Sequence, residues 1–472
     1  MGLRINLNTA ALNAHRWLGV NDASLSKSIE NLSSGYRINV AADDPAGLVI
    51  SEGLRAQAQG LQQALMNTSQ AINLIKTSEA AMQEIHNILR QMRDLAVHAA
   101  NAGANEEAAI AADQAQIESA IGSLDRIAAQ TQFGSKKLLD GSAGVMGQIT
   151  GTTGSAAGTF VSGTTDTKAG TYTITIDQAA TRTQLVGAGA VAGTYAAGIL
   201  KLNGVSIDIA ADSTAAEVAA AINAKSAQSN VTATEGAGVL TLRQTKYGSA
   251  YNIDTSGSTV DLTATGLNLQ GGTLTQGVNV KAHTNEYVTS IEGQGQLWTS
   301  TGGYDSSGLT MLITNGAATD TLTVSVTAGT LTFQIGANAG QTVSAVLQST
   351  ATTLLGVGAE GLSPGGAQNV SEIDVTTNAG ANDAILLLDQ AITQISTQRA
   401  ALGALQRNVL QSALNSLAVA RENVLASESS IRDTDMAAEV VSFTKYQILL
   451  QAGGAMLTQA NQAPQVILQM LR

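Results

Sequence analysis

The segment LSKSIENLSSGYRINVAADDP, residues 25–45, contains the end of one helix and the start of another. Its apolar residues recur at helical spacing up to Leu32, and the breaker Ser33-Ser34-Gly35 then stops the pattern. No apolar period is present from Tyr36 to Ala42. Asp43-Asp44-Pro45 predicts a new helix start, because an acidic side chain caps free N–H groups and proline loses no hydrogen bond at the first helical position.

Helical periodicity extends outward from this segment into both terminal regions of the chain. The first stripe consists of Leu7, Ala11, Ala14, Leu18, Leu25, Ile29 and Leu32. A second helix is predicted up to Asn101-Ala102-Gly103 and a third over 105–129. Helical sequence returns as one stripe over 384–425, and the last stripe consists of Met436, Val440, Phe443, Ile448, Leu449, Met456 and Leu457. Pro464 is expected to avoid a helix interior, because proline removes a backbone N–H.

The middle of the chain has a different period. From about Gly141 the apolar residues alternate, which is typical of strands, and the clearest alternation covers 171–176, 202–209, 239–243 and 321–326. One amphipathic helix is expected from Ala215 to Ala224. Low charge and many Gly and Thr residues also fit disorder, but repeated alternation favours folded strands. The insert is therefore predicted as α+β, with one subdomain or with two that divide near Gly271-Gly272.

These patterns predict a mainly α protein with long terminal helices in coiled-coil or helical-bundle domains and a β-rich α+β insert that faces solvent. The chain has 472 residues, a net charge of −12 and no cysteine. The acidic balance argues against nucleic acid as a partner, and the lack of thiols excludes disulfides and thiol catalysis. No apolar run reaches the length of about 18 residues that membrane insertion needs. Residues 1–6 have no apolar signal-peptide core, so secretion without a cleaved signal is expected.

The sequence shows no catalytic, cofactor or metal motif. None of the four histidines, His15, His86, His98 and His283, has a partner at metal-ligand spacing. Asp433 and Asp435 form a candidate carboxylate pair, for which a solvated or helix-capping role is favoured. We therefore expect a protein that is not an enzyme and that binds no cofactor.

Several motifs closely resemble those of bacterial flagellin. They are LSSGYRIN (32–39), AADDPAGL (41–48), MRDLAV (92–97), DRIAAQTQF (125–133), QRAALGA (398–404), SIRDTDMA (430–437), QANQAP (459–464) and the final LR (471–472). In addition, 202–223 resembles an insert module of flagellins, and 333–342 resembles the β-hairpin of the inner helical domain.

The resemblance implies a subunit that is exported unfolded and polymerises through its terminal helices into a filament for motility. It implies an inner-tube domain from 1–42 and 433–472, an outer-tube domain from 43–142 and 329–432, and a variable surface insert over 143–328. The polymerisation residues it implies are Leu7, Leu18, Leu25, Leu32, Phe443, Ile448, Leu449, Leu457 and Leu471. The implied partners are further copies of the chain, an export chaperone on the C-terminal helix, and the filament cap and hook-junction proteins. The implied location is the extracellular flagellum.

Two other functions stay open on the sequence. A hook–filament junction protein shares such terminal helices. A surface adhesin or glycan-binding protein would use the insert, where Trp298, Tyr287 and Tyr304 are candidate contact residues.

The resemblance also concerns recognition by a host. In flagellins sensed by the vertebrate innate receptor, an Arg, a Leu and a Glu form the main contact. The aligned positions here are Gln91, Leu95 and Gln116, so the leucine is kept and both charges are absent. Charge-assisted hydrogen bonds are roughly twice as strong as neutral ones, and we therefore expect a weak agonist.

Overall fold

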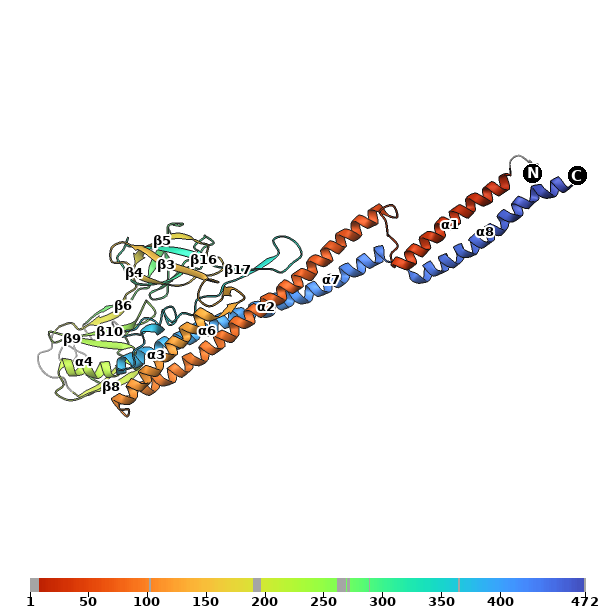
Figure 1. Cartoon of the computed structure of the whole chain (residues 1–472). Helices are drawn as coiled ribbons and strands as arrows, with labels where there is room; N and C mark the ends of the chain where they lie inside the picture. The colour runs from red at the N-terminus through yellow and green to blue at the C-terminus, as the bar shows by residue number, and fades with distance from the viewer. Residues whose placement is uncertain are drawn as a thin grey trace. The chain divides into compact units, whose positions relative to one another are not determined.

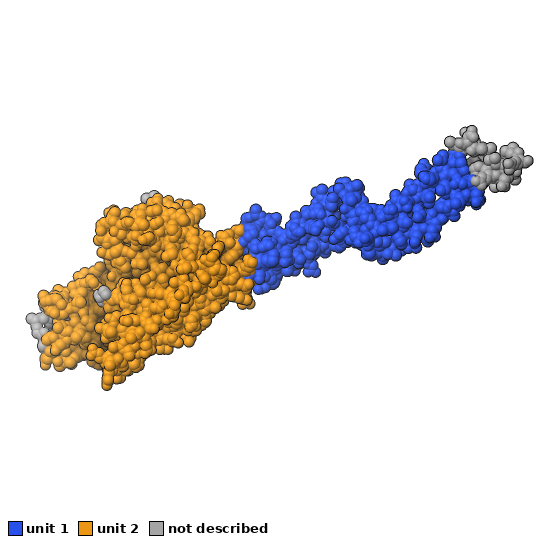
Figure 2. Space-filling model, in the orientation of Figure 1, with its two compact units in different colours: residues 1–69, 334–341, 411–472 blue, residues 70–333, 342–410 orange. Residues whose placement is uncertain are grey.

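The computed structural model describes residues 8–470 apart from 102, 190–196, 261–268, 270–271, 288 and 364–365. It separates into two compact units, coloured in Figure 2. Unit 1 consists of Met1–Ser69, Gln334–Gln341 and Gln411–Arg472, and unit 2 of Gln70–Phe333 and Thr342–Leu410. The long terminal helices and the β-rich insert confirm the predicted fold class.

Unit 1 is helical. Its helices are α1 (Thr9–Ser34), the first part of α2 (Pro45–Ala100), α7 (Gln411–Arg432) and α8 (Met436–Met470). Figure 1 shows α1 and α8 lying side by side. The predicted helix boundary is confirmed: Gly35 ends α1 in the left-handed conformation, and the Asp44 carboxylate accepts a hydrogen bond of 2.9 Å from the Gly47 N–H at the start of α2.

The expectation for Pro464 is wrong, because α8 continues through it to Met470. In a regular helix the N–H of residue 464 would donate to the carbonyl of Ala460, and proline has no N–H. The Asn8 side chain supplies a donor instead, since its Nδ2 lies 2.8 Å from the Ala460 oxygen. The other side-chain atom of Asn8, Oδ1, accepts from Ala11 N–H and caps α1. One residue therefore caps one terminal helix and completes the hydrogen bonding of the other.

A junction formed by residues 35–37 and 431–434 connects the two chain segments where α1 ends and α7 meets α8. The Arg37 N–H donates to the Arg432 carbonyl at 2.7 Å, and the Thr434 N–H donates to the Gly35 carbonyl at 3.0 Å. The Arg432 guanidinium lies 4.8 Å from the centre of the Tyr36 ring and pairs with Glu52 of α2 at 2.9 Å. The junction is thus held by backbone hydrogen bonds and a cation–π contact.

The carboxylates near this junction cap or brace helices. Asp435 Oδ1 accepts hydrogen bonds from the backbone N–H groups of Ala437 and Ala438, which confirms the capping role favoured for this residue. Asp43 accepts from the N–H groups of Asn39 and Val40 and pairs with Lys27 at 2.6 Å. The Lys27 ammonium, followed by these two N–H groups, lowers the pKa of Asp43 to about 2. Asp43 thereby ties the linker to α1.

The helical part of unit 2 contains the rest of α2, α3 (Glu107–Gln130) and α6 (Asn378–Ala404). The predicted ends of the second and third helices agree with these bounds. Fully buried side chains of α2 include Met82, Ile85 and Leu89. Ion pairs join α2 to α6, with Arg93 2.6 Å from Asp389 and Arg399 3.7 Å from Glu79.

The single apolar stripe predicted over 384–425 is corrected by the structure. A π-helical segment, Leu405–Leu410, separates α6 from α7. The wider turn of a π-helix shifts the buried face by a residue, so Leu410 is buried where the continuous stripe places Val409. Along α7 no side chain is buried.

Two lobes of unit 2 form the insert, and we name the first the large lobe (145–178 and 281–328). Its strands are β3 (Val145–Thr152), β4 (Ala157–Ser162), β5 (Gly170–Gln178), β12 (Lys281–Thr284), β13 (Ile291–Glu292), β14 (Leu297–Thr299), β15 (Thr310–Asn315) and β16 (Thr321–Ala328). The five-stranded sheet has the order β13-β12-β5-β16-β3, and the three-stranded sheet has the order β14-β15-β4. Both sheets contribute to one core. Trp298 belongs to this core, fully buried, and its Nε1 donates to the Ala282 and Ile291 carbonyls.

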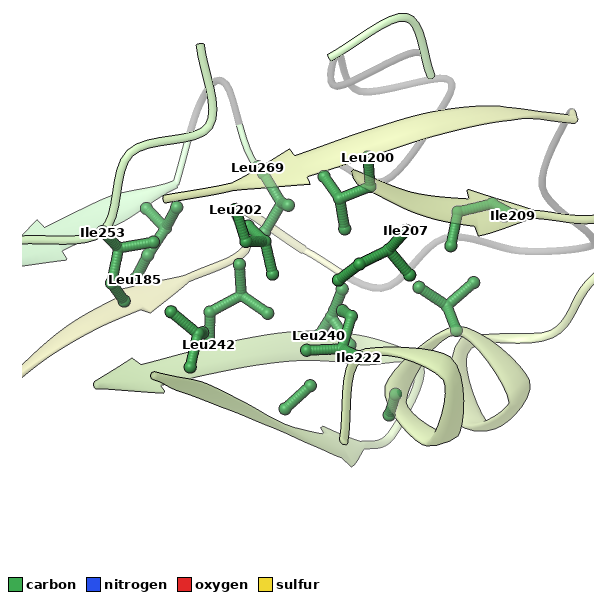
Figure 3. Close-up of a cluster of buried hydrophobic side chains, with 14 of the residues drawn as sticks. Leu185, Leu200, Leu202, Ile207, Ile209, Ile222, Leu240, Leu242, Ile253 and Leu269 are labelled. Atoms are coloured by element: carbon green, nitrogen blue, oxygen red, sulfur yellow. The ribbon is translucent and has the colours of Figure 1, made fainter. Parts of the chain in front are cut away.

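The small lobe (182–275) lies between β5 and β12 in the sequence. Its elements are β6 (Arg182–Val186), β7 (Gly198–Leu202), β8 (Val205–Ile209), α4 (Ala215–Ala224), α5 (Ser226–Ser229), β9 (Val231–Gly236), β10 (Val239–Tyr247) and β11 (Thr273–Thr275). A four-stranded sheet in the order β11-β6-β10-β9, the β7-β8 hairpin and α4 enclose its core (Figure 3). The predicted helix has the bounds expected, with a capping box between Thr214 and Glu217. Gly271, where a subdomain break is predicted, lies outside the described residues.

The strand predicted over 202–209 is wrong as one element. β7 ends at Leu202, and Asn203-Gly204 forms a two-residue turn with φ of 50° and 83° before β8. Positive φ at both central residues is the geometry for which Asn-Gly is preferred. The hairpin predicted over 333–342 is present as β17 (Leu331–Gln334) and β18 (Thr342–Ala345). The remaining short elements are β1 (Gln132–Phe133), β2 (Lys136–Lys137) and the 3₁₀ turn Val370–Glu372.

Replacing Gly204 with alanine should destabilise the β7-β8 hairpin by about 1–2 kcal/mol, because an L side chain is strained at positive φ. No atom lies within 4 Å of the added Cβ, so the effect would come from the backbone alone. Hydrogen exchange of the β7 and β8 amides should accelerate by roughly 5- to 30-fold. Gly236→Ala is the matched control, since its site is equally open and has no positive φ. Equal exchange in the two variants would contradict the turn assignment.

Replacing Lys27 with glutamine should raise the pKa of Asp43 from about 2 toward its ordinary 3.8, because the largest cause of the shift is removed. Two backbone N–H donors remain, so the new value should stay below 3.8. A lowered pKa in the folded state means that Asp43 stabilises the linker above pH 4 and loses this effect as the pH falls toward 2. Carboxyl ¹³C NMR titration measures the midpoint. Glu30→Gln, which removes the other carboxylate partner of Lys27, should leave the pKa of Asp43 near 2. An unchanged Asp43 midpoint in the Lys27→Gln variant would refute the role given to Lys27.

Candidate assembly interface

The paired helices α1 and α8 have no apolar core of their own. Among the side chains that the structure describes in these two helices, no hydrophobic one is fully buried, and the buried residues of α1 are Ser28 and Asn31. Small residues allow the two backbones to approach closely: a Cβ added at Gly453 of α8 would lie 3.2 Å from Leu18 Cδ1 of α1. The pair is therefore a two-helix element in which no described hydrophobic side chain is fully covered.

Large apolar side chains are exposed along both helices. On α1 they are Leu12 (61%), Trp17 (59%), Val20 and Ile29, and on α8 Met436, Val440, Val441 (69%), Ile448 (59%), Leu449 and Met456 (65%). Full burial of one such side chain contributes about 1.5–3 kcal/mol relative to exposure. Large exposed apolar side chains gathered on two paired helices indicate an interaction surface.

The sequence-predicted polymerisation residues lie on this element where the structure describes them. Leu18, Leu25, Leu32, Phe443 and Leu457 are half-buried, Ile448 and Leu449 are exposed, and Leu7 and Leu471 lie outside the described residues. The half-buried members are only partly covered, so each keeps exposed apolar surface.

Three of the most exposed apolar side chains, Leu12, Trp17 and Val441, were missed by the stripe analysis. Trp17 lies three residues after Ala14 and Val441 seven residues before Ile448, so both have helical spacing to stripe members, whereas Leu12 has no stripe member three, four or seven residues away. A signal for Trp17 was present, because aromatic residues are only 3% of the chain and one of its two tryptophans occurs in a terminal helix.

A second candidate surface is a groove between α2 and α3. It has a volume of about 580 Å³, and all three positions aligned with the receptor contact, Gln91, Leu95 and Gln116, line it. The two glutamines are exposed and Leu95 is half-buried. Asp94 supplies a carboxylate to the groove wall. The structure thus brings residues from two helices, 25 positions apart, onto one surface.

The described histidines and carboxylates form no metal site. In the part of the chain described, no group of three or more His, Asp and Glu residues could hold a metal ion. His98 pairs with Asp113 at 2.6 Å, and His283 with Asp177 at 2.9 Å. Burial, together with Arg90 and Arg399, lowers the pKa of His86. No helix within the described ranges is long and apolar enough to cross a membrane.

Comparisons with known protein families match both helical regions and part of the insert. The bacterial flagellin N-terminal helical region matches residues 5–144, and the bacterial flagellin C-terminal helical region matches 385–471. The flagellin hook IN motif matches 193–246, the segment that contains the small-lobe hairpin and α4.

Full-length relatives agree with this assignment. Flagellin C of Vibrio cholerae serotype O1 is 32% identical over 475 residues, which is 100% of both chains. The B-type flagellin of Pseudomonas aeruginosa is 32% identical over 527 residues, again 100% of both. These matches do not favour the hook-junction and adhesin alternatives.

Two solved structures match much of the chain at low similarity. FliC from Burkholderia pseudomallei covers 71% of this chain and 98% of its own, at 18% identity and a TM-score of 0.25. The flagellar hook associated protein-3 of Legionella pneumophila covers 80% of this chain and 98% of its own, at 12% identity and a TM-score of 0.31. The family assignment rests on the sequence relatives. Two helical-region matches in chain order and full-length relatives above 30% identity show that this chain belongs to the bacterial flagellins, structural subunits of the extracellular flagellar filament.

Proposed function

We propose that this flagellin polymerises by burying the exposed apolar surfaces of α1 and α8 against neighbouring copies of the chain. The observation that carries the proposal is the absence of any fully buried hydrophobic side chain among the described residues of these two helices. An element without a core is marginal alone, because helix stability in proteins comes mainly from packing of an apolar face. Contact with further copies supplies the missing packing.

The residues proposed to form this interface are the predicted set together with the exposed side chains that the stripe missed: Leu7, Leu18, Leu25, Leu32, Phe443, Ile448, Leu449, Leu457 and Leu471, with Leu12, Trp17 and Val441. In this proposal 1–42 and 433–472 form the inner tube, and 43–142 with 329–432 form the outer tube. The insert, 143–328, faces solvent. The junction at 35–37 and 431–434 supports the inner boundary, because both chain segments leave their helices there.

The same surface suggests how the subunit behaves before assembly. An exposed apolar face is an aggregation hazard, so we propose that an export chaperone covers α8 until the chain, exported unfolded, reaches the growing filament. The filament cap and hook-junction proteins are the proposed contacts at the two ends of the filament. Secretion without a cleaved signal stays a prediction.

Two acidic residues placed on the exposed face of α8 should abolish polymerisation. The variant is Val441→Asp with Ile448→Asp. The two sites are seven residues apart and therefore lie on the same face of α8. Their side chains are 69% and 59% exposed. Burying an unpaired charge costs several kcal/mol, whereas the same charge is harmless in an exposed monomer. Sedimentation after seeding with filament fragments, followed by negative-stain microscopy, measures assembly.

The matched control is Gln447→Asp with Gln451→Asp, which adds the same charges to exposed polar positions of α8. This control variant should form filaments, whereas a chain that lacks residues 433–472 should not. Normal filaments from the Val441 and Ile448 variant would contradict the proposed interface.

For the groove, we propose that Gln91, Leu95 and Gln116 are the positions facing the vertebrate innate receptor, and that the missing charges make this flagellin a weak agonist. The double variant Gln91→Arg, Gln116→Glu should signal more strongly in a reporter-cell assay, by roughly ten-fold or more if each restored contact contributes about 1 kcal/mol. Gln83→Arg with Gln130→Glu, exposed positions outside the groove lining, is the control and should match the unchanged chain. Equal and strong signalling by all three proteins would refute the proposal.

A further inference from the structure

A polar pocket of about 580 Å³ lies where the two lobes of the insert meet the loop 357–363. The small lobe contributes side chains of β6 and β10, and the large lobe contributes the β13–β14 turn with β4 and β15. Pockets of this size at the meeting of two folded layers are typical binding sites for small molecules. None of these residues belongs to the proposed assembly interface.

The pocket concentrates positive charge in an acidic protein. Arg182, Arg243 and Lys246 line it with one carboxylate, Glu360, which gives a local net charge of 3 − 1 = +2, whereas the chain carries −12. Glu360 is already engaged, because it accepts a hydrogen bond of 2.6 Å from Tyr251 and lies 3.8 Å from Lys246. Within the described residues neither arginine has an ion-pair partner.

Arg182 is held in place for a ligand. Its guanidinium lies 4.3 Å from the centre of the Tyr247 ring, the residue paired with it across β6 and β10. Its Nε is buried and has no hydrogen-bond partner in the part of the chain described. Because Arg182 lines the pocket and no described carboxylate pairs with its guanidinium, the geometry points to an anion at this position.

The rest of the lining suits hydroxyl groups. Gln294, Thr159 and Thr314 line the pocket with exposed side chains that can both donate and accept hydrogen bonds. Apolar side chains such as Leu297 and Leu312 form a minor part of the wall. We propose that this pocket binds a short acidic saccharide, whose carboxylate or sulfate pairs with Arg182 and Arg243 and whose hydroxyls bond to the polar wall. The site would be an additional property of the filament's outer surface and does not depend on how the subunit polymerises.

Isothermal titration calorimetry on the full chain tests the proposal with four probes: trigalacturonate, a sulfated chondroitin disaccharide, neutral maltotriose and sodium sulfate. Binding of either acidic saccharide, with no binding of maltotriose, is expected, and the two acidic probes distinguish carboxylate from sulfate as the anchor. Binding should weaken as salt is added, because the contact is electrostatic. Failure of both acidic saccharides, or sodium sulfate binding as tightly as they do, would overturn the saccharide assignment.

Arg182→Gln with Arg243→Gln should weaken acidic saccharide binding by roughly ten-fold or more, since each lost contact is charge-assisted. Arg243→Gln alone changes an exposed side chain and should keep the fold while still weakening binding. Lys136→Gln with Lys137→Gln is the matched control, because it removes two charges from the exposed strand β2. Unchanged binding in both arginine variants, or equal loss in the lysine control, would contradict the site.

Discussion

The pairing of α1 with α8 is the contact on which the rest of this flagellin depends. It joins segments from opposite ends of the chain, with Asn8 bonded to the Ala460 carbonyl 452 residues away. Yet the pair buries none of its described hydrophobic side chains fully, while Trp17, Val441 and Met456 are more than half exposed. Small residues such as Gly453 bring the backbones together without filling a core. The pairing therefore leaves large apolar side chains of both helices exposed.

The insert, in contrast to this helix pair, buries its own large apolar side chains. Its two lobes have separate cores, one around Trp298 and one around Leu200 and Leu240, each closed by its own strands. The lobes therefore need no neighbour to complete their packing, and their polar surface is free to carry other chemistry. This division fits a subunit whose terminal helices assemble and whose insert faces solvent.

The sequence was a good guide where local chemistry decides structure, and a poor one where distant contacts decide it. Gly35, Asp44-Pro45 and the capping box of α4 end or begin helices by themselves. The Asn203-Gly204 turn was missed, although the alternation changes phase there: Leu202 and Val205 are cross-strand partners three residues apart. Helix α8 continues through Pro464 because the Asn8 side chain donates to the Ala460 carbonyl, which the proline cannot bond. The π-helical segment Leu405–Leu410 shifts the buried face to Leu410. The apolar stripe includes most of the candidate interface but omits Leu12, Trp17 and Val441. The pocket around Arg182 is formed by strands far apart in sequence, so no local pattern indicates it.

Tryptophan fluorescence tests the central claim most directly, because the two tryptophans report on different parts of the molecule. Trp17 is 59% exposed on α1, and Trp298 is fully buried in the large lobe. In a Trp298→Phe variant, Trp17 is the sole reporter. If α1 and α8 bury their apolar faces on assembly, its emission should shift to the blue and acrylamide quenching should fall when monomers convert to filaments. Filaments in which Trp17 stays as quenchable as in the monomer would contradict the account.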